Sequence, residues 1–202
     1  MTQGKIKEIK PIRKSKYLSM YEMKYNSKDN TEKKWMLATR KSEEELNSMY
    51  FEGKKGKIDA VVMVPYHIEE DKLVIIKEYR VPIDDYVYSL PAGLIDEGED
   101  IEVSAKRELK EETGLELVEI NKMDSGFGLY PSPGMTDESF ALIYCTCNGE
   151  VSNKYLEPTE DIQTILVDRK MAAEILKSNV NMDVKAFLAL QIFISVGKDN
   201  EH

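Results

Sequence analysis

Cysteine and histidine are scarce in this chain of 202 residues, which holds two of each. Two histidines, His67 and His202, are too few for the usual zinc ligand sets, and they argue against a Ser-His-Asp or Cys-His nucleophile. Cys145 and Cys147 lie two apart in a run with strand character, so both side chains point to one face. We interpret them as a buried thiol pair.

Long apolar runs and an excess of basic charge are also missing. No run is long enough to cross a membrane, and the first ten residues lack the apolar core of a signal peptide. The 28 basic and 37 acidic residues give a formal net charge of −9, which argues against nonspecific binding to nucleic acid or an anionic membrane. We therefore expect a cytoplasmic protein without nucleic-acid or membrane partners.

A helix is predicted between Asp100 and Gly114. Asp100 is a typical N-cap residue, Glu102 places negative charge in the first turn, and Gly114 can end the helix in the left-handed conformation. A solvated acidic helix would be the simplest interpretation. Glycines on both sides of the stretch, at positions 93 and 114, and the lack of lysine on its acidic face favour a binding site.

The acidic face of that helix predicts a metal site. At about 100° per residue, Glu108, Glu111 and Glu112 share one arc, while the lysines fall on the opposite side. Arg107 can pair with Glu111 one turn on, which leaves the other two glutamates short of partners. Like charges one turn apart destabilise a helix unless a cation lies between them. Carboxylates without histidine or cysteine suit a hard cation such as Mg²⁺.

The same stretch matches the Nudix box, G-x5-E-x7-R-E-U-x-E-E-x-G-U. Every fixed position is met, by Gly93, Glu99, Arg107, Glu108, Glu111, Glu112 and Gly114, and the apolar positions hold Leu109 and Leu115. The chain therefore resembles Nudix hydrolases, which hydrolyse a nucleoside diphosphate linked to another group. The resemblance implies metal ligands, for Mg²⁺ with Mn²⁺ as a possible substitute: chiefly Glu108 and Glu112, then Glu111 and the carbonyl of Ala92. It also implies that Arg107 and Glu99 orient these ligands.

A second motif lies at 130–138, Y-P-S-P-G-M-T-D-E. A stiff Pro-Gly turn is its structural interpretation. The S-P-G turn, with Gly134, followed by Glu138 resembles the ADP-ribose pyrophosphatase branch of the Nudix proteins. The resemblance implies that Glu138 acts as general base or positions the attacking water, with Asp137 as the alternative.

Further residues resemble the substrate-binding positions of that branch. Arg80 resembles its phosphate- or ribose-binding arginine, with a surface salt bridge as the alternative. Trp35 and Arg40 match a W-x4-R pattern that, with Tyr17, implies adenine contacts; a core tryptophan is the alternative. Ser89 departs from the pattern, because the branch usually has a glutamate directly before L-P-A-G. This departure removes a carboxylate beside the metal site.

The resemblance also implies the fold, which is a Nudix α/β/α sandwich of the α/β (α+β) class with a mixed sheet. Residues 1–50 are expected to form a small antiparallel β appendage with a short helix capped by Ser42 and Glu45. Residues 51–202 are expected to form the Nudix domain, with strands at 58–66, 73–79, 87–90, 117–126, 140–147 and 162–167, and later helices at 168–177 and 183–196. The appendage has too few apolar positions for its own core, so we expect a homodimer formed through it.

The expected function is Mg²⁺-dependent hydrolysis of a small nucleotide substrate, ADP-ribose, to AMP and ribose 5-phosphate. A broader nucleotide-sugar or dinucleotide pyrophosphatase would use the same residues. A sensor that binds ADP-ribose without cleaving it is an alternative of another class. The intact box argues against the sensor.

Overall fold

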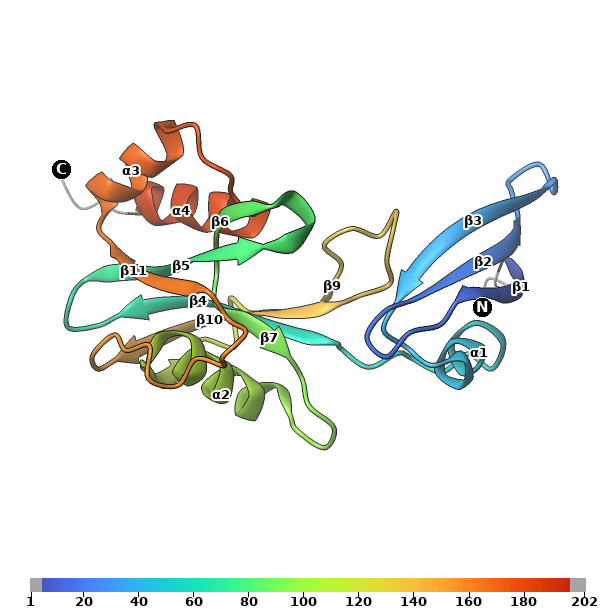
Figure 1. Ribbon diagram of the computed structural model, residues 1–202, viewed down its shortest axis with the longest axis horizontal. Helices are drawn as coiled ribbons and strands as arrows, with labels where there is room; N and C mark the ends of the chain where they lie inside the picture. Colours follow the sequence, from blue (N-terminus) through green and yellow to red (C-terminus); the bar gives the residue numbers. More distant parts are fainter. Residues whose placement is uncertain (1–4, 197–202) are drawn as a thin grey trace. The chain divides into compact units, whose positions relative to one another are not determined.

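The computed structural model describes residues 5–196 (Figure 1). Its contacts divide into two compact units. The smaller unit comprises the described chain up to Asp59 together with Gly128–Phe140. The larger unit comprises Ala60–Phe127 and the described chain from Ala141 onward. Each unit is therefore built from two separate segments, which in the smaller unit lie far apart in the sequence.

The smaller unit contains the expected small antiparallel sheet. Its strands β1 (Ile6–Arg13), β2 (Ser19–Asn26) and β3 (Glu32–Thr39) follow one another in space, and helix α1 (Glu43–Phe51) comes next in the chain. The predicted capping box is confirmed, because the Ser42 hydroxyl accepts from Glu45 N–H and the Glu45 carboxylate accepts from Ser42 N–H. Four buried residues form the core of this unit: Tyr21, Met23, Leu37 and Leu46.

An eight-stranded sheet dominates the larger unit. Its strands are β4 (Ala60–His67), β5 (Lys72–Arg80), β6 (Asp85–Ser89), β7 (Ala92–Leu94), β8 (Glu116–Ile120), β9 (Gly126–Leu129), β10 (Phe140–Asn148) and β11 (Ile162–Val167). The main order is β11-β5-β4-β10-β8, and β6, β7 and β9 pair with β5, β4 and β10 respectively. Short apolar runs in β4 and β5 are buried on both faces, which explains why these strands lie centrally.

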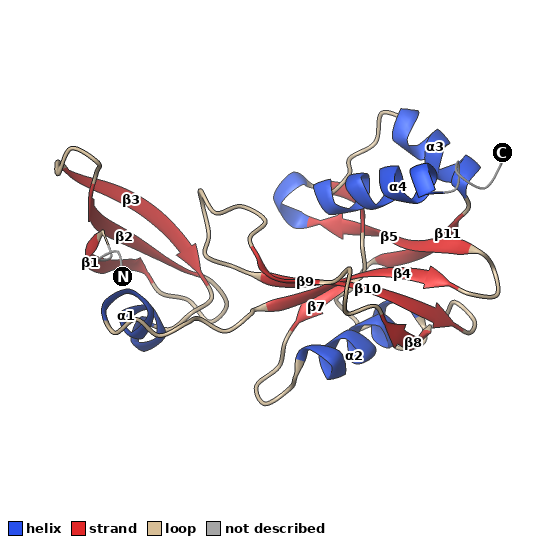
Figure 2. Cartoon of the chain, turned by 180° about the vertical axis from the view of Figure 1, so that it is seen from behind, coloured by secondary structure: helices blue, strands red, loops and turns tan. Residues whose placement is uncertain are grey.

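Helices cover both faces of this sheet. Helix α2 (Ile101–Thr113) packs against strands that include β4, β7 and β8, while α3 (Arg169–Lys177) and α4 (Val184–Val196) lie on the opposite side (Figures 1 and 2). A short 3-10 turn, η1 (Val81–Ile83), follows β5. The layers confirm the expected α/β/α arrangement and mixed sheet. Of the helices described, none is both long and apolar enough to span a membrane.

Local signals place the helix ends where the sequence predicts them. Asp100 caps α2 by accepting from Val103 N–H at 2.9 Å, and Gly114 ends it with φ of 77°. Asp168 caps α3 in the same way.

One predicted strand is wrong. The expected strand at 117–126 is two strands, β8 and β9, because a turn begins at Asn121. The Asn121 side-chain oxygen accepts the N–H groups of Met123 and Asp124, which closes the turn and interrupts the strand.

The two cysteines are buried and free of any disulfide, as predicted. Both lie on β10, on the side of the strand that also holds Ala141 and Ile143. Burial raises the pKa of each thiol to about 12. Such thiols are protonated at neutral pH, so they pack as small apolar groups.

Candidate active site

The site of the larger unit is built where β7 passes α2. Strand β7 pairs with β4 through Ala92 and Gly93, and α2 packs on β7. A side chain at Gly93 would place its Cβ 1.9 Å from Cδ of Glu108, so the glutamate carboxylate fills the space that this glycine leaves. The box glycine is therefore required by a close approach of a carboxylate to the backbone.

Glu112 is the most deeply buried carboxylate of the site, with 4% of its surface exposed. Its Oε2 accepts a hydrogen bond from the N–H of Ala92 at 2.9 Å. Burial raises the pKa of Glu112 well above its ordinary value of 4.5, and the negative charges of Glu78, Glu108 and Glu160 add to the effect. A cation would reverse this penalty, which is the electrostatic signature expected of a metal ligand.

Glu108 lies against Gly93 and is also largely buried. Burial raises its pKa, the neighbouring Arg107 lowers it, and the charges of Glu111 and Glu160 raise it again. The prediction that Glu108 lacks a partner is wrong. Arg107 Nη1 donates to Glu108 Oε1 at 2.7 Å as well as to Glu111 at 3.1 Å, because the guanidinium fork reaches two carboxylates at once.

Arg107 joins the helix to the loop before it. Its Nε and Nη2 donate to Glu99, and Nη2 also donates to the carbonyl of Leu94 at 3.1 Å. Hydrogen bonds from Arg107, with a further one from Ser104, lower the pKa of Glu99 to about 2. Arg107 is thus held on several sides by fixed acceptors, which suits a group that orients carboxylates.

The donors fit a hard divalent cation. Within residues 5–196, no three His, Cys, Asp or Glu side chains are already gathered around one point as a closed metal site. Mg²⁺ does not require such a closed set, since it usually keeps several waters and takes one or two carboxylates. The buried, like-charged Glu108 and Glu112 beside the backbone of Ala92 provide that number of donors.

The structure adds two carboxylates that the sequence analysis missed. Glu78 on β5 and Glu160, in the turn before β11, each raise the pKa of Glu112 by their charge. Glu78 follows Val74 and Ile76 on one face of β5, and a buried carboxylate beside these two apolar residues is a signal that could have singled it out. Glu160 carried no such signal, because its neighbours Glu157 and Asp161 are equally acidic.

Arg80, a predicted substrate residue, forms an ion pair at the end of β5. Its Nη2 lies 2.7 Å from Oε1 of Glu78, and about half of the arginine side chain is exposed. This ion pair is the structural alternative foreseen for Arg80. A role in substrate binding stays a prediction.

Four of the predicted site residues in the smaller unit form two hydrogen bonds with one another. Trp35 Nε1 donates to the carbonyl of Gly134 at 3.1 Å, and Arg40 Nε donates to Oε2 of Glu138 at 2.6 Å. The S-P-G loop is thereby attached to β3. Trp35 is 51% exposed, so the alternative of a core tryptophan is wrong. Tyr17 lies in the turn after β1 and is also exposed.

Asp137, the alternative to Glu138, has a different environment. Its side chain is mostly buried, and Oδ2 lies 3.6 Å from the ammonium of Lys41. The same ammonium lies 2.8 Å from Asp59, whose carboxylate accepts from Ser139 N–H. Asp137 is therefore part of an internal ion cluster, and the partly exposed Glu138 is the more accessible of the two carboxylates.

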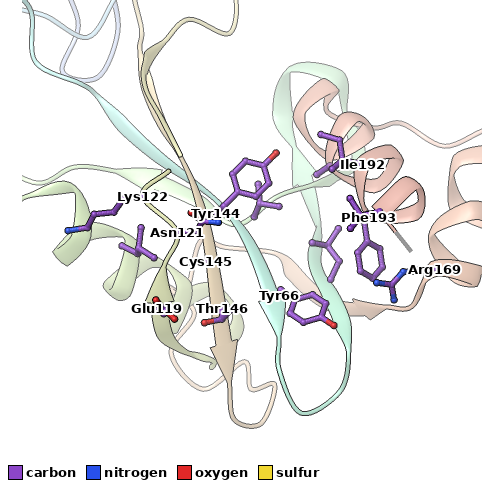
Figure 3. A pocket seen from close by; sticks show the side chains of 15 residues that line it. Tyr66, Glu119, Asn121, Lys122, Tyr144, Cys145, Thr146, Arg169, Ile192 and Phe193 are labelled. Carbon is purple, nitrogen blue, oxygen red and sulfur yellow. The ribbon is translucent and has the colours of Figure 1, made fainter. Parts of the chain in front are cut away.

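A separate hollow of about 690 Å³ lies on the other face of the larger sheet (Figure 3). Side chains of Ile192 and Phe193 on α4 face it from one side, and Tyr66 and Tyr144 lie along the strands opposite. None of the predicted site residues lines it. The sheet separates this hollow from Glu108 and Glu112, because α2 lies on the opposite face of the sheet.

Comparison with known families shows the family to which this chain belongs. The sequence model of the NUDIX domain matches residues 56–186. This chain belongs to the Nudix family. The resemblance drawn from the box is thereby confirmed. Unlike the box alone, the match extends over all the strands of the larger sheet.

Characterised relatives include ADP-ribose pyrophosphatases. The protein of that name from Bacillus subtilis is 29% identical over 127 residues, which cover 61% of this chain and 65% of the relative. The one from Saccharomyces cerevisiae is 29% identical over 138 residues, covering 68% of this chain and 55% of the relative. Both relatives carry the name of the branch that the S-P-G motif resembles. The chain thus spans less than two thirds of the length of these relatives.

A solved structure shares the fold along nearly the whole chain. The crystal structure of an ADP compounds hydrolase aligns with a TM-score of 0.69 at 17% identity, covering 98% of this Nudix chain and 97% of the other. At this identity the likeness shows the fold. The shared fold includes elements outside the Nudix box.

Proposed function

We propose that this Nudix protein is a Mg²⁺-dependent hydrolase of ADP-ribose, which it cleaves to AMP and ribose 5-phosphate. The observation that carries the proposal is the pair of buried glutamates, Glu108 and Glu112, held against the β7 backbone at box positions. The ADP-ribose pyrophosphatases among its relatives support the substrate class.

The chain's residues have distinct tasks in this proposal. Bound Mg²⁺ supplies charge neutralisation of the pyrophosphate and activation of a water. Glu108 and Glu112 would hold the cation with the carbonyl of Ala92, and Glu111 would share in its binding. Arg107 keeps Glu108 and Glu111 in place through its guanidinium fork. This arrangement explains why an arginine accompanies the acidic cluster.

Glu138 is proposed to act on the attacking water. Its ion pair with Arg40 fixes one carboxylate oxygen, and the side chain keeps partial access to solvent. Glu160 is a second candidate on a specific observation, since its charge is felt by both Glu108 and Glu112. The two candidates are separated by comparing Glu138→Gln with Glu160→Gln.

Substrate recognition is proposed for both units. Arg80 would bind phosphate or ribose through a guanidinium that is half exposed. Trp35, whose N–H is already bound by Gly134, would stack on adenine, with Arg40 and Tyr17 as further contacts. These roles follow from motif positions and from the exposure of the side chains.

A homodimer formed through the smaller unit is also proposed. Met20 and Met36 lie on one face of its sheet, and both are exposed. Tyr17 and Trp35 are also exposed. Exposed apolar residues on a unit with a small core favour burial against a second copy. Light scattering should give twice the chain mass, and Met36→Asp should reduce it, whereas Met123→Asp on the larger unit should not. A monomer before any substitution would refute the dimer.

The decisive experiment is a substrate panel with purified protein and Mg²⁺. ADP-ribose, another ADP-sugar, a dinucleotide and a nucleoside triphosphate would be compared by kcat/KM and product identity. The proposal expects the highest kcat/KM for ADP-ribose, with AMP as a product. Equal rates across the diphosphate substrates would support the broader pyrophosphatase. Tight binding of ADP-ribose without product would support the sensor.

A further inference from the structure

Glu78 is a buried carboxylate to which the proposed function gives no task. Its side chain is 8% exposed, although it belongs to a strand in the middle of the larger sheet. Arg80 Nη2 lies 2.7 Å from its Oε1, yet this buried oxygen accepts no hydrogen bond with good geometry from the residues that the structure describes. A carboxylate left in this state inside a protein calls for an explanation.

The sheet register places Glu78 beneath α2. Ile76 pairs with Ser89 on one side and with Thr164 on the other, so these three residues share one face of the sheet. Glu78 lies two residues along β5 from Ile76 and therefore points to that same face. Thr164 Oγ1 donates to the backbone carbonyl of Glu112 at 3.2 Å, which places the end of α2 above this face.

Glu78 is thus a diagonal neighbour of Ser89. Ser89 is 5% exposed and stands directly before L-P-A-G, where the resemblance leads one to expect a glutamate. Burial raises the pKa of Glu78, and the neighbouring Arg80, with a smaller contribution from Ser89, partly offsets that rise. The carboxylate missing from β6 is therefore matched by one on the neighbouring strand.

We propose that Glu78 supplies a further carboxylate to the divalent-cation site, directly or through a bound water. It takes the role of the carboxylate that the family pattern has at position 89, where this chain has serine. The inference rests on the proposed function, since it assumes that Glu112 holds a divalent cation. It adds a donor that lies outside the Nudix box. The charge of Glu78 on Glu112 agrees with their closeness.

Binding of Mn²⁺ to the full-length, metal-free protein tests the inference without any substrate. Glu78→Gln should weaken Mn²⁺ binding about tenfold in calorimetry. Its melting temperature without metal should stay level or rise, because one buried charge among like charges is removed. The matched control is Glu102→Gln, which changes an exposed glutamate of α2 paired with Lys106 and should leave Mn²⁺ affinity unchanged.

Moving the carboxylate provides the sharper test. The double variant Glu78→Gln with Ser89→Glu should recover Mn²⁺ affinity to within about threefold of the unaltered protein, because the charge returns to the same face one strand away. A double variant no better than Glu78→Gln would overturn the proposed placement. If Glu78→Gln does not fold, Glu78→Asp keeps the charge one methylene further back, and unchanged Mn²⁺ affinity there would overturn the inference.

Glu112→Gln separates this inference from the proposed function. If Glu112→Gln abolishes Mn²⁺ binding and Glu78→Gln leaves it intact, Glu78 has no part in the site while the metal site stands. If neither substitution changes Mn²⁺ binding, the proposed metal site itself fails, and the inference fails with it. Weaker binding in both variants, with recovery in the double variant, supports the inference.

Discussion

The two units of this protein use acidic side chains in opposite ways. In the larger unit, burial raises the pKa values of Glu78, Glu108 and Glu112, and the charges of Glu78, Glu108 and Glu160 add to the rise at Glu112. In the smaller unit, Glu138 pairs with Arg40, and Asp59 and Asp137 both lie close to Lys41. The first cluster has four carboxylates and the cations of Arg80 and Arg107, whereas the second has three carboxylates and the cations of Arg40 and Lys41, so the first carries the larger formal negative charge.

This difference separates a binding site from a framework. Carboxylates that are buried together are stable only when a proton or a cation joins them, so such a cluster is prepared for a ligand. A buried cluster built around a cation of the chain itself joins the segments that contribute to it. The S-P-G loop is therefore held in place by Lys41, Asp59 and Asp137. The glutamates of α2 and of the sheet face that α2 covers perform the proposed chemistry.

Glu112→Gln should produce the largest effect and tests the unbalanced cluster directly. Removing a ligand charge should lower kcat/KM for ADP-ribose about 1,000-fold, the consequence of losing several kcal/mol of transition-state stabilisation. The metal-free protein should melt no earlier than the unaltered one. Near-normal activity with Mg²⁺ would contradict the ligand assignment, and Glu102→Gln provides the control.

Glu138→Gln should lower kcat about 100-fold and leave KM nearly unchanged, as expected for a group that acts on the water in the transition state. Asp137→Asn is the comparison within the same loop. Asp137→Asn should mainly lower the free energy of unfolding, because the buried charge of Lys41 would have one partner fewer. If KM rises while kcat holds in Glu138→Gln, the loop only binds substrate; if Glu160→Gln alone lowers kcat, the base belongs to the larger unit.

Trp35→Ala tests the smaller unit as a binding element. It should weaken ADP-ribose binding by about 1–3 kcal/mol if the indole stacks on adenine, measured by KM or calorimetry. Trp35→Phe keeps a stacking face and should lose much less. A pyrimidine nucleotide sugar, which offers a smaller ring, should be affected less than ADP-ribose. Equal losses for both substrates would rule out adenine recognition.

The dependence of metal-free stability on pH should show the smallest effect. The folded pKa values of Glu108 and Glu112 lie above 4.5, so between that value and the folded values the native state binds more protons than the unfolded state. The free energy of unfolding should therefore fall as pH rises through this window, measured by urea titration with a chelator. Glu112→Gln should flatten the slope. A slope that is the same in both proteins would contradict the raised pKa of Glu112.

Local chemistry made much of the larger unit predictable. The caps of α2, its acidic arc and the box glycines depend on spacings within one helix, and those spacings can be read from the chain. Glu78 could not be placed beside Ser89 in this way, because their relation depends on strand register. Trp35 and Arg40 were predicted as substrate residues from a motif, whereas their contacts with Gly134 and Glu138 were not predicted, because those partners come from a distant segment.

The two-segment make-up of the smaller unit bears on the order in which the protein folds. Its contacts from Trp35 and Arg40 join residues 99 and 98 positions apart, so they cannot form until the ribosome has synthesised most of the larger unit's sheet. Closing so long a loop slows the formation of these contacts. The smaller unit is therefore completed only after Gly128–Phe140 has been synthesised. Deleting residues 1–40 would leave Gly128–Phe140 without those partners during and after synthesis. The single substitution Trp35→Ala removes one of these two contacts and keeps the other, so it disturbs this region less than the deletion.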